Sequence, residues 1–245
     1  MKALILNSGI GKRMGEITKT KPKCMTPISE TDTIVSRQLK MLEQKGITEV
    51  VMTTGPFEDI LKEYCESLGL NLNINFVHNE IYDQTNYIYS IYKAKDSLDD
   101  DIVLMHGDLV YGEDVLDDVL ANPESCMTVS TTLPLPEKDF KAVIKNGKIS
   151  KVGIEFFDDA LAAQPLYKLN REDWSVWLDS IVAFVEHGTT NCYAENAFNV
   201  VSDYTSIKPL DVQDRLCGEI DNLDDLEVMK GKIAKEEKTY EKRRK

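Results

Sequence analysis

The fold is decided by one stretch near the start of the chain, Lys2-Ala3-Leu4-Ile5-Leu6-Asn7-Ser8-Gly9-Ile10-Gly11-Lys12-Arg13-Met14-Gly15. Its first five residues form an apolar run of strand length. The glycines that follow let the backbone approach a bulky anion, whose charge Lys12 and Arg13 can neutralise. A second basic segment completes the loop with the sequence Lys19-Thr20-Lys21-Pro22-Lys23-Cys24-Met25-Thr26-Pro27. We therefore expect a strand that opens into a polyphosphate-binding loop.

Two well-known phosphate loops were compared with this segment. The Walker A pattern is absent, because no glycine here stands in its frame. The spacing Gly9-x-Gly11-x-x-x-Gly15 comes near a dinucleotide fingerprint, which should lead directly into a long helix. Pro22 and Pro27 leave little room for such a helix. A dinucleotide loop and an ordinary solvated loop remain as weaker alternatives.

These residues resemble the nucleotide-binding segment of the sugar-phosphate nucleotidyltransferase superfamily, with the pattern G-x-G-x-R…P-K…P. The matching residues are Gly9, Gly11, Arg13, Pro22, Lys23 and Pro27. The chain looks most similar to the small cytidylyltransferases that activate phosphocholine, 2-aminoethylphosphonate or phosphoglutamine. Family members usually carry two alanines before the first glycine, where this chain has Asn7-Ser8. The resemblance extends to Gly107-Asp108 and to Glu219-Ile220-Asp221.

Composition restricts the possible partners and location. The chain has 245 residues, 42% hydrophobic content and a net charge of −13, so general affinity for nucleic acid is not expected. Positive charge is instead concentrated in the N-terminal loop and in the stretch Lys230–Lys245. The five cysteines form no C-x-x-C pair, and neither a signal peptide nor an apolar run of membrane length is present. We expect a cytoplasmic monomer or homodimer without membrane contact.

Strands and helices alternate at short spacing over the first half of the chain, which predicts an α/β fold with a doubly wound, mostly parallel (Rossmann-like) sheet. The predicted strands are 2–6, 49–53, 73–77, 101–106, 126–133 and 207–212. The predicted helices are 34–45, 58–68, 86–98, 113–120, 195–202 and the segment from residue 223 onward. Thr33 and Asn222 are expected to cap helices, and Gly46 and Gly69 to end them.

The pattern changes after Pro134, where residues 140–144 and 148–152 flank Asn146-Gly147, a strong hairpin signal. We expect the stretch 153–190 to be less regular. The whole chain, 1–245, is interpreted as a single domain. Its nucleotide-binding core would cover about 1–133 and 205–245, and an inserted, acceptor-facing subdomain would cover about 134–204.

Asp108 follows a buried-type strand, and ligands of open parallel sheets bind beyond the carboxyl ends of the strands. A triphosphate normally arrives with Mg²⁺, which prefers carboxylates and phosphate oxygens. The family resemblance implies that Asp108 is a metal ligand and that Asp221 is its partner, with Glu219 supporting or replacing it. Glu219 and Asp221 share one side of an extended backbone, because strand side chains repeat every two residues.

The resemblance also implies roles for other residues. Arg13 and Lys23 would carry catalysis, by holding the leaving phosphates and by neutralising charge at the reacting phosphates. The expected nucleotide contacts are Asn7, Ser8, Gly9, Gly11, Lys12, Arg13, Asn79, Thr85, Asn86, Ser90 and Asp108.

An ammonium group is held well by aromatic faces beside carboxylates. The candidate acceptor contacts are Lys23, Glu155, Tyr167, Trp174, Trp177, Asp179, Tyr193 and Glu195. For the tryptophans, packing within the insertion's own core is an equally weighted interpretation.

The resemblance implies that the partners are CTP and a small phosphorylated acceptor and that the cofactor is Mg²⁺. The expected activity is a cytidylyltransferase reaction that releases pyrophosphate, in a pathway such as surface polysaccharide decoration. A sugar-1-phosphate nucleotidyltransferase is the main alternative. A non-catalytic nucleotide-binding regulatory subunit is a further one.

Overall fold

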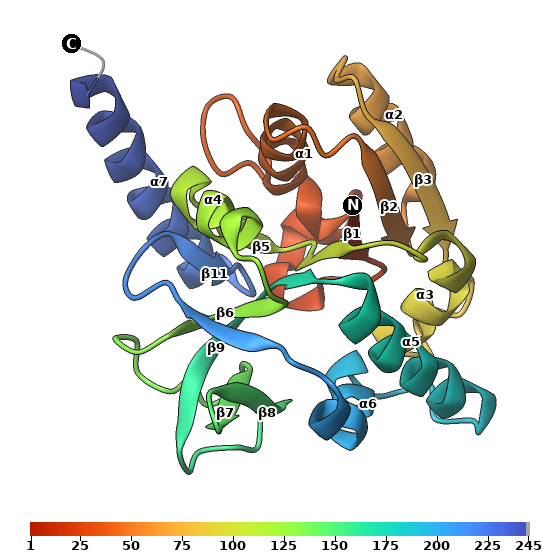
Figure 1. Ribbon diagram of the computed structural model, residues 1–245. Helices are drawn as coiled ribbons and strands as arrows, with labels where there is room; N and C mark the ends of the chain where they lie inside the picture. The colour runs from red at the N-terminus through yellow and green to blue at the C-terminus, as the bar shows by residue number, and fades with distance from the viewer. Residues whose placement is uncertain (244–245) are drawn as a thin grey trace.

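Strand β1 (Lys2–Asn7) lies between β4 (Ile102–His106) and β2 (Glu49–Thr54) and runs parallel to both. On the far side of β2, β3 (Asn73–His78) continues the parallel sheet. The computed structural model describes residues 1–243 and shows this sheet between two layers of helices (Figure 1). The predicted Rossmann-like α/β core is therefore confirmed. Because Leu6 pairs with His106, the loops that follow β1 and β4 leave the sheet side by side.

The alternation of side chains along β1 divides the core into two layers. Ala3 and Ile5 face one side of the sheet, and Leu4 and Leu6 face the other. The first side is covered by α1 (Ile34–Gln44), α2 (Glu58–Ser67) and α4 (Glu113–Ala121). The second side is covered by α3 (Tyr87–Ala94), α5 (Arg171–Glu186) and α6 (Ala194–Val201). Both faces of β1 are thus buried, which explains its continuous apolar sequence.

The structure confirms several helix and strand boundaries that local sequence signals predicted. The Thr33 hydroxyl accepts a hydrogen bond from the Ser36 amide, and the Ser36 hydroxyl accepts one from the Thr33 amide, which begins α1. The hairpin of β7 (Lys141–Lys145) and β8 (Lys148–Gly153) turns at Asn146 and Gly147, both with positive φ. Helix α3 is shorter than predicted and continues as the 3₁₀ helix η3 (Lys95–Ser97).

The prediction that residues 153–190 are less regular was wrong. Residues Ala160–Leu169 form β9, which lies inside the main sheet, antiparallel to β4 and to β6 (Cys126–Ser130). Pro165 lowers the strand signal because it has no backbone N–H, and it lies where the β6–β9 register shifts. The strand order is β10-β6-β9-β4-β1-β2-β3, with β10 (Lys208–Asp211) parallel to β6.

The second half of the stretch 153–190 forms α5. Its residues Trp174, Trp177 and Ile181 are buried at helical spacing. Because β9 belongs to the main sheet, residues 134–204 do not form a separate layer. Strand β7 pairs with β9, and β8 pairs with β7. The proposed division into a nucleotide-binding core and an acceptor-facing insertion stays a prediction.

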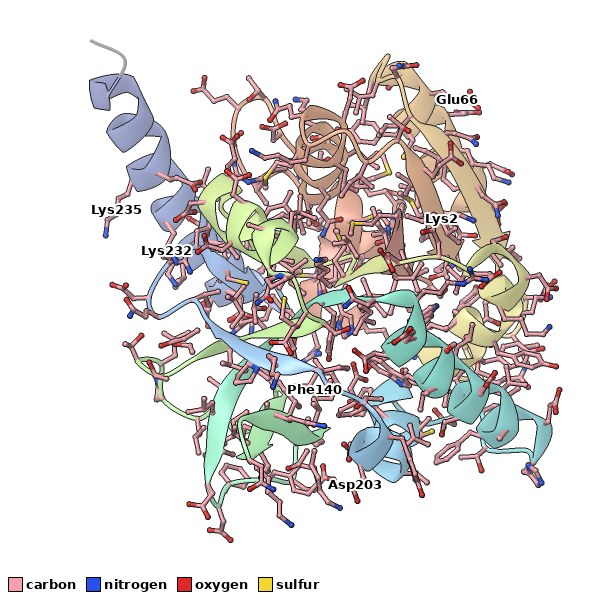
Figure 2. All side chains as sticks on the ribbon, viewed as in Figure 1. Lys2, Glu66, Phe140, Asp203, Lys232 and Lys235 are labelled. Carbon is pink, nitrogen blue, oxygen red and sulfur yellow. The ribbon has the colours of Figure 1, made fainter. Side chains whose placement is uncertain are left out.

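The chain ends in α7 (Leu223–Arg243), which begins beside a two-stranded sheet of β5 (Leu109–Tyr111) and β11 (Cys217–Glu219). The Asn222 side chain accepts hydrogen bonds from the backbone amides of Asp224 and Asp225, so its predicted capping role is confirmed. Lys232 and Lys235 lie along α7, far from Phe140 (Figure 2). The last two residues of the basic C-terminal stretch lie outside the described residues. Among residues 1–243, no helix combines the length and apolarity needed to cross a membrane.

Candidate active site

The glycine-rich loop leaves β1 at the carboxyl edge of the sheet. Gly11 has φ +68, and a Cβ atom there would lie 3.0 Å from the Cβ of Lys23. The loop can therefore pack directly against the second basic segment only because Gly11 has no side chain. The two segments form only short 3₁₀ helices, η1 (Lys12–Thr18) and η2 (Lys23–Met25), as Pro22 and Pro27 predict.

Lys23 lies at the centre of a charge cluster. Its Nζ is 2.5 Å from Asp108 Oδ2 and 2.8 Å from Asp221 Oδ1, and Arg13 is 2.9 Å from the same Asp221 oxygen. Burial alone would lower the pKa of Lys23, but the charges of Asp108 and Asp221 raise it above its ordinary value. Burial would raise the pKa of Asp108, but Lys23 and His106 hold it below its ordinary value. The cluster is thus charged, and the structure brings together the predicted residues Arg13, Lys23, Asp108 and Asp221.

A group of possible metal ligands adjoins this cluster. One ligand atom from each of His106, Asp108 and Glu219 lies within 4.8 Å of the others. Asp108 Oδ1 is buried without a hydrogen-bond partner among the described residues, as is His106 Nε2. A buried carboxylate oxygen without a donor beside further carboxylates suits a hard divalent cation. Asp108 and Glu219 therefore offer oxygen ligands of the kind that a divalent metal ion takes. The predicted partner Asp221 is not in this group, because its Oδ1 is paired with Lys23 and Arg13.

His106 was missed by the sequence analysis, although it precedes Asp108 by two residues and shares its side of the strand end. Its Nδ1 lies 2.8 Å from Glu219 Oε1. Burial would lower the pKa of His106, but the hydrogen bond with Glu219 raises it to about 9. Burial and the charge of Asp108 raise the pKa of Glu219 to about 7. Glu219 thus supports His106 as well as facing Asp108.

The cavity at this edge of the sheet has two parts that meet at Arg13, Asp108 and Asp221. One part has a volume of about 280 Å³ and contains the cationic residues. We call its lining residues Gly9, Gly11, Lys12, Arg13 and Lys23 the phosphate wall. The other part has a volume of about 230 Å³ and contains aromatic residues. We call Tyr87, His106, Phe140 and Tyr193 the aromatic wall.

The aromatic wall is a continuous set of ring contacts. Tyr87 packs edge-on against His106 at 4.9 Å between ring centroids, and Phe140 packs edge-on against Tyr193 at 5.0 Å. Tyr87 also donates a hydrogen bond to Glu195 Oε2, and Tyr167 donates one to Glu195 Oε1 at 2.9 Å. Glu195 is 1% exposed and lies behind Tyr87 rather than in the cavity. It therefore orients the aromatic wall from the core.

Four of the predicted nucleotide contacts lie on the α3 side of the same cavity. Asn79, Thr85, Asn86 and Ser90 line it together with Ser8. The Asn79 amide donates to Thr85 Oγ1 and to Ser90 Oγ, both at 3.0 Å, and its Oδ1 accepts from the Ile81 amide at 3.1 Å. Asn79 therefore holds this part of the cavity in shape and has little hydrogen-bonding capacity left for a ligand.

Several predicted acceptor contacts lie elsewhere. Trp174 and Trp177 are each 1% exposed and pack in the core, where their indole N–H groups donate to backbone carbonyls. Their helical spacing therefore reflects core packing. Glu155 and Asp179 are exposed and do not line the cavity, and Tyr167 is buried behind it. Of these candidates, the structure brings Tyr193 to the cavity, while Lys23 lines its phosphate part.

The cavity also contains residues that the sequence analysis did not select. They include His106, Tyr82, Tyr87, Lys138, Asp139 and Phe140. Residues 138–140 stand in the connection between β6 and β7, where no motif marks them. Burial and the charges of Asp221 and Asp225 raise the pKa of Asp139, so this carboxyl group faces the acidic side of the site.

The site lies at the edge of a parallel sheet and combines a glycine-rich cationic loop, convergent carboxylates and a two-part cavity. This arrangement is typical of a nucleotide-binding enzyme. Comparison with known proteins identifies the class more closely. The family model described as nucleotidyl transferase matches residues 2–139, more than half of the chain. The chain belongs to this family and is therefore a nucleotidyltransferase.

Its relatives include cytidylyltransferases. The CTP:phosphoglutamine cytidylyltransferase of Campylobacter jejuni is 26% identical over 258 aligned residues, which cover 93% of this chain and 98% of that enzyme. The choline-phosphate cytidylyltransferase of Streptococcus pneumoniae is 30% identical over 104 residues, which cover 42% of this chain and 43% of that enzyme. The solved structure of the CTP:phosphocholine cytidylyltransferase from Streptococcus pneumoniae has the same fold. Its TM-score is 0.77 at 18% identity, with 94% of this chain and 97% of that chain covered.

Proposed function

We propose that this enzyme is a Mg²⁺-dependent cytidylyltransferase that transfers CMP from CTP to a small phosphorylated compound bearing an amine. The observation that carries this proposal is the position of Asp108 and Asp221 at the border between the phosphate and aromatic walls. A reacting phosphorus atom at this border would have cations on one side and an acceptor-sized cavity on the other. The Campylobacter relative, which is named for CTP and phosphoglutamine, supports both the donor and the acceptor class.

In the proposed reaction, an acceptor phosphate oxygen attacks the α-phosphorus of CTP in line. The bond between the α-phosphorus and the bridging oxygen breaks, and pyrophosphate leaves with the electron pair. Backbone amides at Gly9 and Gly11, with Lys12 and Arg13, would bind the β- and γ-phosphates. A phosphate nucleophile is already ionised near neutral pH, so the chain needs no general base. Positioning and charge stabilisation supply most of the rate.

Lys23 is the residue we expect to act at the reacting phosphates. It is half-buried between two carboxylates, and its raised pKa keeps it charged there. Asp108 and Asp221 would hold Mg²⁺, with Glu219 in support. When bound, Mg²⁺ stabilises negative charge on phosphoryl oxygens as a Lewis acid.

The aromatic wall is the proposed acceptor site. Ring faces attract an ammonium group, and Asp139 adds a carboxyl group at the same part of the cavity. The Asn79 amide is committed to internal hydrogen bonds and cannot bind a sugar hydroxyl, whereas Asn86 also lines this part of the cavity. Phosphocholine, 2-aminoethylphosphonate and phosphoglutamine all remain within the proposed acceptor class.

The test is a pyrophosphate-release assay with each nucleoside triphosphate in turn, Mg²⁺, pyrophosphatase and a panel of phosphorylated acceptors. We expect release with CTP and an amine-bearing acceptor, and loss of release when EDTA removes the metal. Release with UTP and glucose-1-phosphate instead would favour the sugar-phosphate alternative. CTP binding without release from any acceptor would favour a non-catalytic regulatory role.

A further inference from the structure

The two carboxylates that we expect to hold the metal ion are bridged by a lysine of the same chain. Lys23 Nζ lies 2.5 Å from Asp108 Oδ2 and 2.8 Å from Asp221 Oδ1. An ion bound by these two oxygens would overlap the ammonium group, because Mg²⁺ lies only about 2.1 Å from its oxygen ligands. Lys23 and a divalent ion therefore exclude each other from this pair of oxygens.

The charges around this pair of carboxylates are balanced within the chain. Asp221 Oδ1 also pairs with Arg13 at 2.9 Å, so two carboxylates face two cations. A divalent ion added to this group would repel the ammonium group at contact distance. A triphosphate brings the negative charge that offsets both the ion and the two displaced cations. Charge is therefore compensated only if the ion and the triphosphate enter together.

Lys23 is placed so that it can exchange one anion for the other. Its stem runs along the glycine loop, since a Cβ atom at Gly11 would lie 3.0 Å from Lys23 Cβ and 3.5 Å from Lys23 Cδ. The backbone of Lys23 is held in η2, whereas the bonds of its four-carbon stem can rotate. A phosphate bound by the Gly11 amide would lie beside this stem. Rotation of the stem would then carry Nζ from the carboxylates to the phosphate.

From this geometry we infer that Lys23, with Arg13, is a built-in substitute for the metal ion. It neutralises Asp108 and Asp221 when no nucleotide is bound, and it releases them when a triphosphate takes the ammonium group. The metal ion alone therefore binds weakly, and metal and nucleotide enter the site together. The inference rests on the proposed function, because it takes Asp108 and Asp221 as metal ligands. It goes further by assigning the order of binding.

The test measures the binding of Mn²⁺ alone, without nucleotide, by electron paramagnetic resonance of the free ion. Lys23→Met keeps the length of the stem and removes its charge, so the dissociation constant for Mn²⁺ should fall roughly 10-fold or more. Lys23→Arg keeps the charge and should bind Mn²⁺ as weakly as the wild type. Adding Asp108→Asn to Lys23→Met should abolish the gained affinity, which locates the ion at this carboxylate.

Lys40→Met is the matched control. Lys40 Nζ pairs with Asp32 Oδ1 at 2.6 Å, and neither residue lines either part of the cavity. This substitution removes one positive charge and one lysine–carboxylate pair elsewhere on the chain. It should leave the affinity for Mn²⁺ unchanged.

Thermal unfolding gives a second readout. Lys23→Met leaves the carboxylate of Asp108 without its cation, so its Tm should fall and then recover when Mn²⁺ is added. Mn²⁺ should change the Tm of the wild type much less. If Lys23→Met is unfolded with and without Mn²⁺, Arg13→Met decides, because the Arg13 side chain is 63% exposed and its loss spares the fold. Arg13→Met should lower the dissociation constant for Mn²⁺ roughly 3-fold.

The same Mn²⁺ affinity in wild type, Lys23→Met and Arg13→Met would overturn the inference. So would a gain in affinity that survives Asp108→Asn. Either result leaves the proposed function intact if the wild type still releases pyrophosphate from CTP and an acceptor. If the wild type releases none with any acceptor, the proposed function itself fails.

Discussion

The phosphate wall and the aromatic wall face the same cavity, but they are held in place by different interactions. The phosphate wall comes from one continuous segment, and its cations Arg13 and Lys23 are paired with the carboxylates of Asp221 and Asp108. The aromatic wall is drawn from α3, β4 and the segments that precede β7 and α6, and packs through ring edges. Glu195 supports it from the core, and Glu219 pairs with His106. Ion pairs dominate the first wall, whereas ring packing dominates the second.

This difference predicts how substitutions will act. Changes at Lys23 or Asp108, where the two walls meet, should affect the chemical step with every acceptor, because in the proposed reaction the charges there meet the reacting phosphates. Changes in the aromatic wall should affect acceptor affinity and leave the use of CTP intact. The substitutions below are ordered by the size of the expected effect.

Asp108→Ala should have the largest effect. It removes the half-buried carboxylate that meets Lys23 and offers Oδ1 to a metal ion, so kcat should fall about 10³-fold or more with every acceptor. The measurement is steady-state pyrophosphate release at saturating Mg²⁺. Asp203→Ala, on the exposed 3₁₀ helix η4 (Ser202–Tyr204), is the control and should keep the wild-type rate. A normal rate for Asp108→Ala would remove this residue from the metal site.

Lys23→Ala should be next in size. It removes the cation at the border of the two walls, so kcat should fall roughly 10²-fold, as for loss of a preorganised charge. The KM for CTP should change much less, because the glycine amides and Arg13 remain. Kinetics with CTP and acceptor varied in turn will separate the two constants. An effect confined to KM would mean that Lys23 only recruits substrate.

Phe140→Leu tests the aromatic wall. Leucine keeps much of the buried volume but removes the ring face, so the KM for an ammonium-bearing acceptor should rise roughly 5-fold. The KM for CTP should stay the same. Tyr193→Phe keeps its ring and is the matched control, with a smaller expected change. If Phe140→Leu changes the KM for CTP and acceptor equally, the two walls do not act separately.

Lys141→Met should have the smallest effect of these. Lys141 Nζ donates to the Pro136 and Asp139 carbonyls at 2.6 and 3.1 Å and lies 4.2 Å from the centre of the Phe157 ring. Loss of these bonds should loosen the segment that carries Lys138, Asp139 and Phe140, and raise the acceptor KM about 3-fold. Lys145→Met, at the exposed end of the same strand, should change nothing. An unchanged acceptor KM in Lys141→Met would show that this segment is held by other contacts.

The contrast between the phosphate wall and the aromatic wall explains which parts of the site the sequence could predict. The phosphate wall is local in sequence, and Gly9, Gly11, Arg13 and Lys23 have spacing constraints that a single chain reveals. Asp108 could be added because ligands bind beyond the carboxyl ends of parallel strands. Asp221 was added from the family resemblance alone, because it follows β11, which pairs antiparallel with β5 in a separate two-stranded sheet. Most of the core was predicted for the same reason, since hydrophobic periodicity and caps such as Thr33 are local signals.

Apart from Tyr193, which was a predicted acceptor contact, the aromatic wall could not be predicted in this way. Phe140 and Tyr193 reach the cavity through β9 and α5, which the sequence analysis did not recognise as regular elements. Pro165 concealed the strand, and the tryptophans of α5 gave the same signal for core packing as for a ligand site. His106 had a usable signal in its two-residue spacing from Asp108. Lys138 and Asp139 had none, because their position depends on contacts between distant segments.

The central claim is that the enzyme transfers CMP from CTP to an amine-bearing phosphorylated acceptor and releases pyrophosphate. The most direct measurement is phosphorus NMR of the wild-type enzyme with CTP, Mg²⁺ and an equimolar mixture of phosphocholine, 2-aminoethylphosphonate, phosphoglutamine and glucose-1-phosphate. We predict that one amine-bearing acceptor is consumed first and gives the coupled signals of a CMP-linked product together with pyrophosphate. Consumption of glucose-1-phosphate ahead of all the amine-bearing acceptors would contradict this account.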